Sequence, residues 1–431
     1  MMTGKDARRG GRGCRILAAV LNDPRPDRLE SIETGRMPQV STSFDVAIVG
    51  GGVIGSAVAY FLAANSAFDG RVAVIERDPS YAHCTTSRSV GGIRQQFSTR
   101  ENILLSQFAA EFVRRADEHL AVEDAVPALG FVEQGYLFLA DQGAVERMRA
   151  NHALQRRCGA RVALLDVEDL RSRYSWLDTA GVALGSLGIE NEGWIDSHAL
   201  LMAFKAKARA LGAEYIEGEI TGIEVKSERV GGVRLASGKS IACAALVNAA
   251  GARAAQIASM AGIILPVAPR KRQVFVFECR QHLPGCPLVI DPTGMYFRPE
   301  SGLFLCGISP SASDDPDTFD HEVDYAPFEL RLWPMLARRV PAFEAIKLRN
   351  AWACTYAYNI LDQNAVIGPH PGIPNFYFAN GFSGHGLQQS PGVGRAISEL
   401  IVHGAYKSID LTRFGFWRIA ANKPIRELSV V

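Results

Sequence analysis

The chain has 431 residues, of which 48% are hydrophobic and 21% charged, and its formal net charge at pH 7 is +1. That length is enough for two domains with buried cores, and the near-zero charge without a basic stripe argues against nucleic acid as a partner. No stretch is apolar over the roughly 20 residues that a membrane-spanning helix needs, so no transmembrane segment is predicted.

The first 36 residues differ in character from the rest of the chain. They are rich in arginine and glycine and show no apolar periodicity. An organellar targeting peptide is one interpretation, although such peptides contain few acids and this segment contains several. A disordered tail, or translation that starts at Met37, is the other. We treat 1–43 as a tail and expect a cytoplasmic protein, with organellar targeting and peripheral attachment to a membrane left open.

A β–α–β unit follows this tail. The apolar run Phe44–Gly50 predicts a strand, Val53–Asn65 a helix and Arg71–Glu76 a second strand. The turn between the first strand and the helix, Gly50–Gly55 (GGGVIG), fits the pattern G-x-G-x-x-G. Its first glycine lets the chain turn off the strand, its second lets the backbone approach a pyrophosphate, and its third lets helix and strand pack closely.

The end of the second strand narrows the choice of dinucleotide. Glu76 lies 21 residues after Gly55, where a carboxylate accepts hydrogen bonds from ribose hydroxyls and repels a 2′-phosphate. Arg77 is the kind of residue that binds a 2′-phosphate, but the position of Glu76 outweighs it. The unit therefore predicts a dinucleotide with an unphosphorylated ribose, which is FAD or NAD.

The remainder of the chain alternates between helical and strand patterns. Helical spacing is found over Ser197–Leu211 and from about Pro391 to His403, and the acidic segment Ser309–Phe328 is expected to be an exposed loop. Strands are expected at Ala213–Glu217, Ile220–Lys226, Gly232–Leu235, Ala244–Asn248 and Phe376–Ala379, and within Gln273–Ile308. Nucleotide-type segments at both ends of a strand-rich middle predict two interleaved domains.

Four further segments of small and hydroxyl-bearing residues follow in order: Cys84–Phe97, Val247–Ala252, Trp352–Tyr356 and Gly381–Gln388. Their order and spacing resemble the D-amino-acid-oxidase superfamily of flavoenzymes, which includes sarcosine oxidase, dimethylglycine dehydrogenase and glycine oxidase. Within it, the run Trp352–Arg395 resembles the FAD-dependent oxidoreductase domain proteins, one mitochondrial member of which helps to assemble respiratory complex I.

This resemblance implies FAD as the cofactor and an α/β fold, in which a Rossmann-like FAD-binding domain is interleaved with a mixed-sheet α+β substrate domain. The implied FAD-binding domain takes residues 44–130, 196–265 and 350–410. The substrate domain takes 131–195 and 266–349, and 411–431 form a C-terminal tail.

The resemblance also implies which residues contact FAD. Thr85, Thr86 and Ser87 are short donors for the pyrophosphate or the ribityl chain, and the loop Gly381–Gly394 runs into the last helix near Pro391. The dipole of that helix stabilises negative charge on reduced flavin. The full implied set is Gly50, Gly52, Val53, Ile54, Gly55, Glu76, Arg77, Thr85, Thr86, Ser87, Gly91, Gly92, Ala250, Gly251, Cys354, Gly381, Gly384, His385, Gly386, Leu387 and Gln388.

The candidate catalytic residues are Arg94, Tyr296, Arg298, His385 and Gln388. Arg94 matches the position at which sarcosine oxidase holds the substrate carboxylate, and a planar guanidinium suits bidentate binding of that group. Pairing of Arg94 with a protein acid or with the FAD phosphates is the alternative. Tyr296 and Arg298 either line the pocket or bridge the sheet, and His385 is expected near the flavin ring.

Three positions depart from, or bear on, the sarcosine oxidase pattern. Gln388 replaces a lysine that supplies a second cation for the carboxylate. Phe304 stands where those oxidases carry the lysine that promotes reaction of reduced flavin with oxygen, which favours a dehydrogenase. Cys354 lies close to the cysteine that those oxidases bond to the flavin, but the relatives that look closest have glycine there, so a free thiol and non-covalent FAD are favoured. The other cysteines form no C-x-x-C pair and no metal-ligand cluster.

These residues predict an FAD-dependent enzyme that oxidises a C–N bond of an amine or amino acid, of the N-methyl or D-amino-acid type. Hydride passes to flavin N5, and the electrons then go to an acceptor that is a protein or a quinone. The alternative is an assembly or scaffold protein of a respiratory complex that retains FAD with little catalysis. Arg94 favours the enzyme, whereas Gln388 and Phe304 fit lost catalysis. An NAD-linked dehydrogenase conflicts with the loop Gly381–Gly394.

Overall fold

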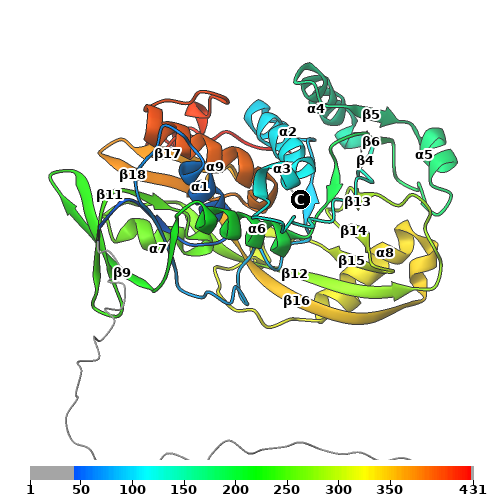
Figure 1. The fold of residues 1–431 in the computed structure, drawn as a ribbon. Helices are drawn as coiled ribbons and strands as arrows, with labels where there is room; N and C mark the ends of the chain where they lie inside the picture. The colour runs from blue at the N-terminus through cyan, green and yellow to red at the C-terminus, as the bar shows by residue number, and fades with distance from the viewer. Residues whose placement is uncertain (1–42, 429–431) are drawn as a thin grey trace, which may run out of the picture. The chain divides into compact units, whose positions relative to one another are not determined.

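The computed structural model describes residues 43–428, which form two eight-stranded sheets, a two-stranded one and the helices that cover them (Figure 1). The expectations about the tail therefore concern residues outside the described range, except for residue 43. Between residues 43 and 428, no helix combines the length and the apolar character that crossing a membrane requires.

The first sheet has the strand order β17-β18-β11-β1-β2-β8, with the hairpin β9–β10 attached to β11. Its central strands pair in parallel, and β17 closes one edge in antiparallel fashion. Parallel strands are covered on both faces, which is why β1 is continuously apolar from Val46 to Val49. The strands are β1 (Ser43–Val49), β2 (Val72–Glu76), β8 (Glu214–Glu217), β9 (Ile220–Lys226), β10 (Arg229–Leu235), β11 (Ser240–Asn248), β17 (Val366–His370) and β18 (Ile373–Asn380).

One face of this sheet is covered by helices from distant parts of the chain: α1 (Val53–Ala63), α6 (Ser197–Ala210) and α9 (Gly386–His403), with α2 (Arg100–Arg114) and α3 (Ala116–Leu120) beside them (Figure 1). The opposite face is covered by the β9–β10 hairpin and α7 (Ala254–Ser259). Helices α1 and α9 touch through their backbones, since a Cβ added to Gly394 would lie 2.7 Å from the carbonyl carbon of Ala57. The predicted β–α–β unit and the α/β fold are confirmed.

The last helix begins at Gly386, five residues before the expected start at Pro391, and this corrects the loop predicted over Gly381–Gly394. Proline is accepted early in a helix because the first N–H groups have no intrahelical partner. Pro391 lies one turn further in, where its missing N–H leaves the carbonyl of Leu387 without the usual bond. The hydroxyl of Ser390 donates to that carbonyl at 2.8 Å instead.

The second sheet is mixed, with the order β16-β12-β15-β14-β13-β4-β6-β5. One of its faces packs phenylalanines against α5 (Val167–Arg173), α8 (Trp333–Arg339) and the π-helical turn Phe328–Leu332. Helix α4 (Val145–Arg157) lies beside β5 and β6 (Figure 1). The strands are β4 (Tyr136–Ala140), β5 (Val162–Leu165), β6 (Leu184–Gly188), β12 (Val267–Cys279), β13 (Leu288–Ile290), β14 (Tyr296–Glu300), β15 (Leu303–Gly307) and β16 (Ile346–Asn359).

The chain passes between the two sheets several times, as the predicted interleaving requires. Strands of the first sheet come from residues 43–76, 214–248 and 366–380, and those of the second from 136–188, 267–307 and 346–359. Strand β16, whose residues the sequence assigned mainly to the FAD-binding segment 350–410, pairs along β12 in the second sheet. The short pair β3 (Gly92–Ile93) and β7 (Gly193–Trp194) forms the two-stranded sheet.

The segment 411–428, expected as part of a tail, is packed against the body of the protein. Leu411 and Phe414 are buried, and α10 (Trp417–Ala420) carries Arg418, whose guanidinium is fully buried. It is paired with the equally buried carboxylate of Asp362 at 2.8 Å. Asp362 also accepts a hydrogen bond from the backbone N–H of Ile425 at 3.0 Å, so one carboxylate anchors the C-terminal segment at two points.

Candidate functional site

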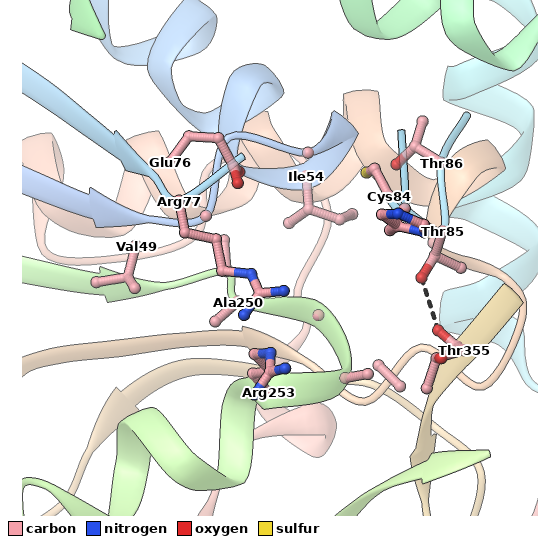
Figure 2. Close-up of a pocket in the computed structure, with 18 of the residues that line it drawn as sticks. Val49, Ile54, Glu76, Arg77, Cys84, Thr85, Thr86, Ala250, Arg253 and Thr355 are labelled. Atoms are coloured by element: carbon pink, nitrogen blue, oxygen red, sulfur yellow. Dashed lines mark hydrogen bonds between the residues drawn. The ribbon is translucent and has the colours of Figure 1, made fainter. Parts of the chain in front are cut away.

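A cavity of about 470 Å³ opens where the parallel strands β1, β2 and β11 end (Figure 2). Val49, Glu76 and Ala250 line it from these three strand ends, and the turn Gly50–Ile54 forms its floor. The carboxyl ends of parallel strands are the usual ligand site of α/β sheets, because the helix N-termini that follow point at the same place.

The glycines of the turn are required by its geometry. Gly50 has a φ of +97°, and a Cβ added there would lie 2.5 Å from the carbonyl oxygen of Ala249. A Cβ on Gly55 would lie 1.9 Å from the carbonyl oxygen of Gly50, so only glycine lets α1 pack against the strand. At Gly52 a Cβ would meet side-chain atoms no nearer than 3.5 Å, which leaves this backbone open to a ligand. The turn therefore fits a bound pyrophosphate.

The carboxylate of Glu76 is fixed at the end of β2. Its Oε2 accepts the backbone N–H of Gly51 at 2.7 Å and its Oε1 that of Asp78 at 2.8 Å. Both oxygens keep further lone pairs for a ribose hydroxyl. The hydroxyl of Tyr81, also in the cavity wall, is buried without a hydrogen-bond partner among the described residues. An unpaired buried hydroxyl fits a polar ligand at this wall.

Two arginines reach into the cavity from opposite sides, Arg77 after β2 and Arg253 before α7 (Figure 2). Burial lowers the pKa of Arg253, and the nearby charge of Arg77 lowers it further. Two cations that face one another are relieved by an anionic ligand group. Phe319 covers the guanidinium of Arg253 at 4.3 Å and also lines the cavity. Neither Arg253 nor Phe319 was predicted, since neither belongs to a local motif.

A further side of the cavity is formed where the segment after β2 meets β16 of the second sheet. Thr85 donates its hydroxyl to the carbonyl of Thr355 on β16 at 2.6 Å (Figure 2). Thr86 accepts the backbone N–H of Val53 at 3.3 Å, at the start of α1. Gly386 at the N-terminus of α9 completes this wall, and no side chain caps that helix. The positive end of the α9 dipole therefore faces the cavity, as negative charge on a reduced flavin requires.

The structure divides the implied FAD contacts into two groups. Those that line the cavity are Gly50, Gly52, Val53, Ile54, Glu76, Arg77, Thr85, Thr86, Ala250, Gly251, Gly384, Gly386 and Leu387. Those that do not line it are Gly55, Ser87, Gly91, Gly92, Cys354, Gly381, His385 and Gln388. The hydroxyl of Ser87 lies 3.0 Å from the imidazole of His198 instead, and Cys354 is buried in the sheet, where burial raises the pKa of its thiol to about 12.

Arg94, His385 and Gln388 come together in a second group, which we call the Arg94 cluster. The side-chain oxygen of Gln388 accepts the backbone N–H of Arg94 at 2.8 Å, and Nη2 of Arg94 lies 3.2 Å from Nε2 of His385. The guanidinium stacks on Phe97 at 3.9 Å and donates to the carbonyl of Gln96 at 2.6 Å. Burial, and then the charge of Arg94, hold the pKa of His385 well below its usual range, so this imidazole is neutral.

Glu192 holds the two residues that follow Arg94 by hydrogen bonds, and the sequence analysis did not predict this role. Its two oxygens accept the backbone N–H of Gln95 and the side-chain amide of Gln96, each at 2.8 Å. Burial raises the pKa of Glu192 to about 7, against the opposing effect of these hydrogen bonds and of Arg94. From the sequence alone, an acidic residue in the segment Glu190–Gly193 would be expected on the surface. The burial of Glu192 becomes evident only from the tertiary packing of this segment.

Tyr296 and Arg298 of β14 stand on the sheet face that also carries Tyr136 of β4. Burial raises the pKa of Tyr136 to about 12 and that of Tyr296 above its usual range, so both hydroxyls are neutral. Arg298 donates to the carbonyl of Val90 at 2.9 Å and is paired with Glu300. This arginine therefore ties the sheet to the segment before Arg94.

The position given to Phe304 needs a correction. Side chains alternate along a strand, and the register of β14 and β15 sets Leu305 opposite Arg298, on the face of Tyr296. Phe304 lies on the other face, where it packs against Phe277 and Phe343. The residue of β15 on the face of Tyr296 is Leu305, which is also uncharged.

No group of three or more histidine, cysteine or acidic side chains within 43–428 has the arrangement of a metal site.

The family described as "FAD dependent oxidoreductase" matches residues 45–400 of this chain. The "FAD-dependent oxidoreductase domain-containing protein 1" of Xenopus laevis is 43% identical over 435 residues, which are 92% of this chain and 86% of that protein. Monomeric sarcosine oxidase of Bacillus sp. (strain B-0618) is 25% identical over 91% of this chain and 100% of that protein. The crystal structure of L-proline dehydrogenase from P. horikoshii is similar with a TM-score of 0.79 and 27% identity, and the match covers 88% of this chain and 99% of that one.

Proposed function

This chain belongs to the FAD dependent oxidoreductase family, and from that premise we propose that it oxidises a C–N bond of a small amine or amino acid. The observation that carries the proposal is the position of Arg94. Its backbone is held by Gln388 on α9, the residue next to Leu387. Leu387 lines the cavity at the ends of β1, β2 and β11, which we call the cofactor cavity. A buried guanidinium on a residue whose backbone is anchored next to that cavity suits the carboxylate of an N-methyl or D-amino acid.

Bound FAD supplies the hydride acceptor, and the protein supplies orientation and electrostatics. Nε2 of His385 accepts from Arg94, so Nδ1 carries the proton of this neutral imidazole. His385 and the tyrosines Tyr136 and Tyr296 are therefore uncharged around the substrate. Uncharged neighbours keep the bound amine neutral, which is the form that donates a hydride.

We propose that the electrons leave to a separate acceptor, a protein or a quinone, instead of oxygen. The support is Leu305, the side chain of β15 on the face of Tyr296. A cation there would stabilise superoxide as it forms, and leucine does not.

The test is an anaerobic absorbance spectrum of the purified holoprotein before and after addition of sarcosine, dimethylglycine, proline and D-amino acids in turn. Bleaching of the flavin band by one of them supports the proposal and names the substrate class. Reoxidation that is slow in air and fast with a dye or quinone supports a dehydrogenase. A flavin that none of these compounds bleaches would instead support the alternative, an FAD-retaining scaffold for a respiratory complex. The observation in favour of that alternative is that the guanidinium of Arg94 already donates to the carbonyl of Gln96 and stacks on Phe97.

A further inference from the structure

A loop that follows a strand of the second sheet reaches the cofactor cavity. Residues 316–323, which we call the cofactor strap, lie between β15 and the π-helical turn Phe328–Leu332. The strap contributes Phe319 and His321 to the lining of the cavity. The sequence analysis expected this segment only as an exposed loop, and the contacts of these two residues give it a second role.

Both ends of the strap are fixed to neighbouring residues of β12. The two carboxylate oxygens of Asp315 accept from the guanidinium of Arg272 at 2.7 and 2.9 Å, and both side chains are largely buried. The backbone N–H of Asp324 donates to the side-chain oxygen of Gln273 at 2.6 Å. The strap therefore begins and ends beside adjacent residues of one strand, as a compact surface loop does.

The aspartates of the strap face β12 and not the cavity. Asp317 is paired with Arg270 at 3.2 Å, and Asp320 is paired with Lys271. Neither aspartate lines the cavity. Unpaired carboxylates beside a pyrophosphate would repel it, so this pairing allows an acidic segment to lie next to an anionic cofactor.

His321 fastens the strap to the side of the cavity formed by β16. Its Nε2 lies 2.8 Å from the hydroxyl of Thr355, and its ring is stacked on that of His83 with 5.2 Å between the ring centres. Both of these neighbours also line the cavity. Phe319 is therefore held between the His321 contacts on one side and the Asp317 pair on the other.

Phe319 lies at the end of the cavity that fits the adenosine half of FAD. The centre of its ring is 4.3 Å from the guanidinium carbon of Arg253. Burial, and then the nearby charge of Arg77, lower the pKa of Arg253, so the two guanidinium groups are neighbours. Arg77 directly follows Glu76, whose carboxylate fits a ribose hydroxyl. The ring of Phe319 is therefore on the side of the ribose.

The surface next to Arg253 is apolar. Ile257 and Met260 follow Arg253 at intervals of four and three residues, so the three share one face of α7 and its flanking residues, and all three line the cavity. Ile220, the first residue of β9, adds a further apolar group to the lining. Purines bind to surfaces of this kind, where their flat faces stack on an aromatic ring or a guanidinium plane.

We propose that the cofactor strap is part of the FAD site, and that the adenine of FAD stacks on the surface made by Phe319 and Arg253. A loop of the second sheet then completes a cavity that is formed largely by the first sheet. The assignment concerns binding of the cofactor and does not depend on the proposed reaction.

The test measures binding of FAD and of ADP to the full-length chain from which FAD has been removed, by calorimetry. ADP carries the adenosine half of the cofactor without the flavin. In Phe319→Ala we expect the affinity for both compounds to fall by about the same factor, tenfold or so, because the purine loses its aromatic partner.

Two further variants separate stacking from a general effect on the loop. Phe319→Tyr keeps the ring, so both affinities should stay within about twofold of those of the original protein. Glu322→Ala changes an exposed residue of the strap that does not line the cavity, and it should change neither affinity. An unchanged unfolding temperature confirms that each variant is folded.

Unchanged FAD affinity in Phe319→Ala would overturn the inference. Loss of FAD affinity with unchanged ADP affinity would also overturn it, since the ring would then act on the flavin half. An equal loss in Phe319→Tyr and Phe319→Ala would exclude stacking, and an original protein that does not bind ADP at millimolar concentration would have no separate adenosine site. Each of these results is obtained whether or not an amine reduces the flavin, so the proposed function stands or falls separately.

Discussion

The cofactor cavity and the Arg94 cluster lie next to each other but are built differently. The cavity is made largely of backbone: the turn Gly50–Gly55, and the N-termini of α1 and α9. The Arg94 cluster is made of buried side chains that fix one another, and Arg94 and Gln388 are 294 residues apart. A backbone site is specified by local sequence and tolerates change around it, whereas a side-chain cluster depends on every member.

This comparison predicts that adding a single methyl group at Gly55 disrupts the cofactor cavity. In Gly55→Ala the new Cβ lies 1.9 Å from the carbonyl oxygen of Gly50, so the turn and α1 must move apart. We expect loss of bound FAD and a free energy of unfolding lower by about 3 kcal/mol. Absorbance of the purified protein and a denaturant titration measure both. Gly231→Ala is the control, because nothing lies within 4 Å of its added Cβ; a yellow, stable Gly55→Ala would contradict the backbone view of the cavity.

At the Arg94 cluster, the largest expected effect is a change in how the free energy of unfolding depends on pH. Glu192 has its pKa raised from 4.5 to about 7 by burial, so between these values the folded chain holds a proton that the unfolded chain has lost. Folding stability then falls as pH rises through this window, by about 3 kcal/mol in total, and levels off above it. Glu192→Gln should remove that part of the slope. The free energy of unfolding is measured at several pH values from 4.5 to 8, and equal slopes in both proteins would show that Glu192 does not titrate there.

A smaller effect is expected at Arg94. Arg94→Lys keeps the charge but loses the planar fork that also stacks on Phe97, so the KM of a carboxylate substrate should rise about 30-fold, or about 2 kcal/mol. The flavin spectrum should not change, since Arg94 does not line the cofactor cavity. Steady-state kinetics with a dye acceptor provide the measurement. An unchanged KM would place the carboxylate elsewhere.

The smallest effect is expected at Cys354 of β16, the residue before Thr355 in the cavity wall. Its thiol is buried, has a raised pKa and does not line the cofactor cavity, so it is a poor nucleophile towards FAD. Acid precipitation should release all of the yellow colour from the protein, and equally from Cys354→Ser. Colour that stays with the precipitate of the original protein and is lost in the variant would reveal a covalent bond.

The features that could be predicted from the sequence are those of the cofactor cavity, which has local signals, more than those that depend on tertiary packing. The first β–α–β unit and Glu76 were predicted because their signals lie within about 30 residues and have local physical causes. The start of α9 was missed because Pro391 marks a helix start in sequence, and the replacement bond from Ser390 becomes visible only in three dimensions. Arg253 and Glu192 carry no motif, and their roles come from tertiary burial alone.

The strand order has a consequence for how the protein is made. Strand β18 and helix α9, which complete the first sheet and the wall around the cofactor, lie at residues 373–403, whereas β1, and α1 against which α9 packs, lie within residues 43–63 and are synthesised earlier. Until α9 has been synthesised, the surface of α1 that packs against it stays uncovered. FAD that binds before α9 docks lacks the part of the cavity wall that Gly386 and Leu387 of this helix provide.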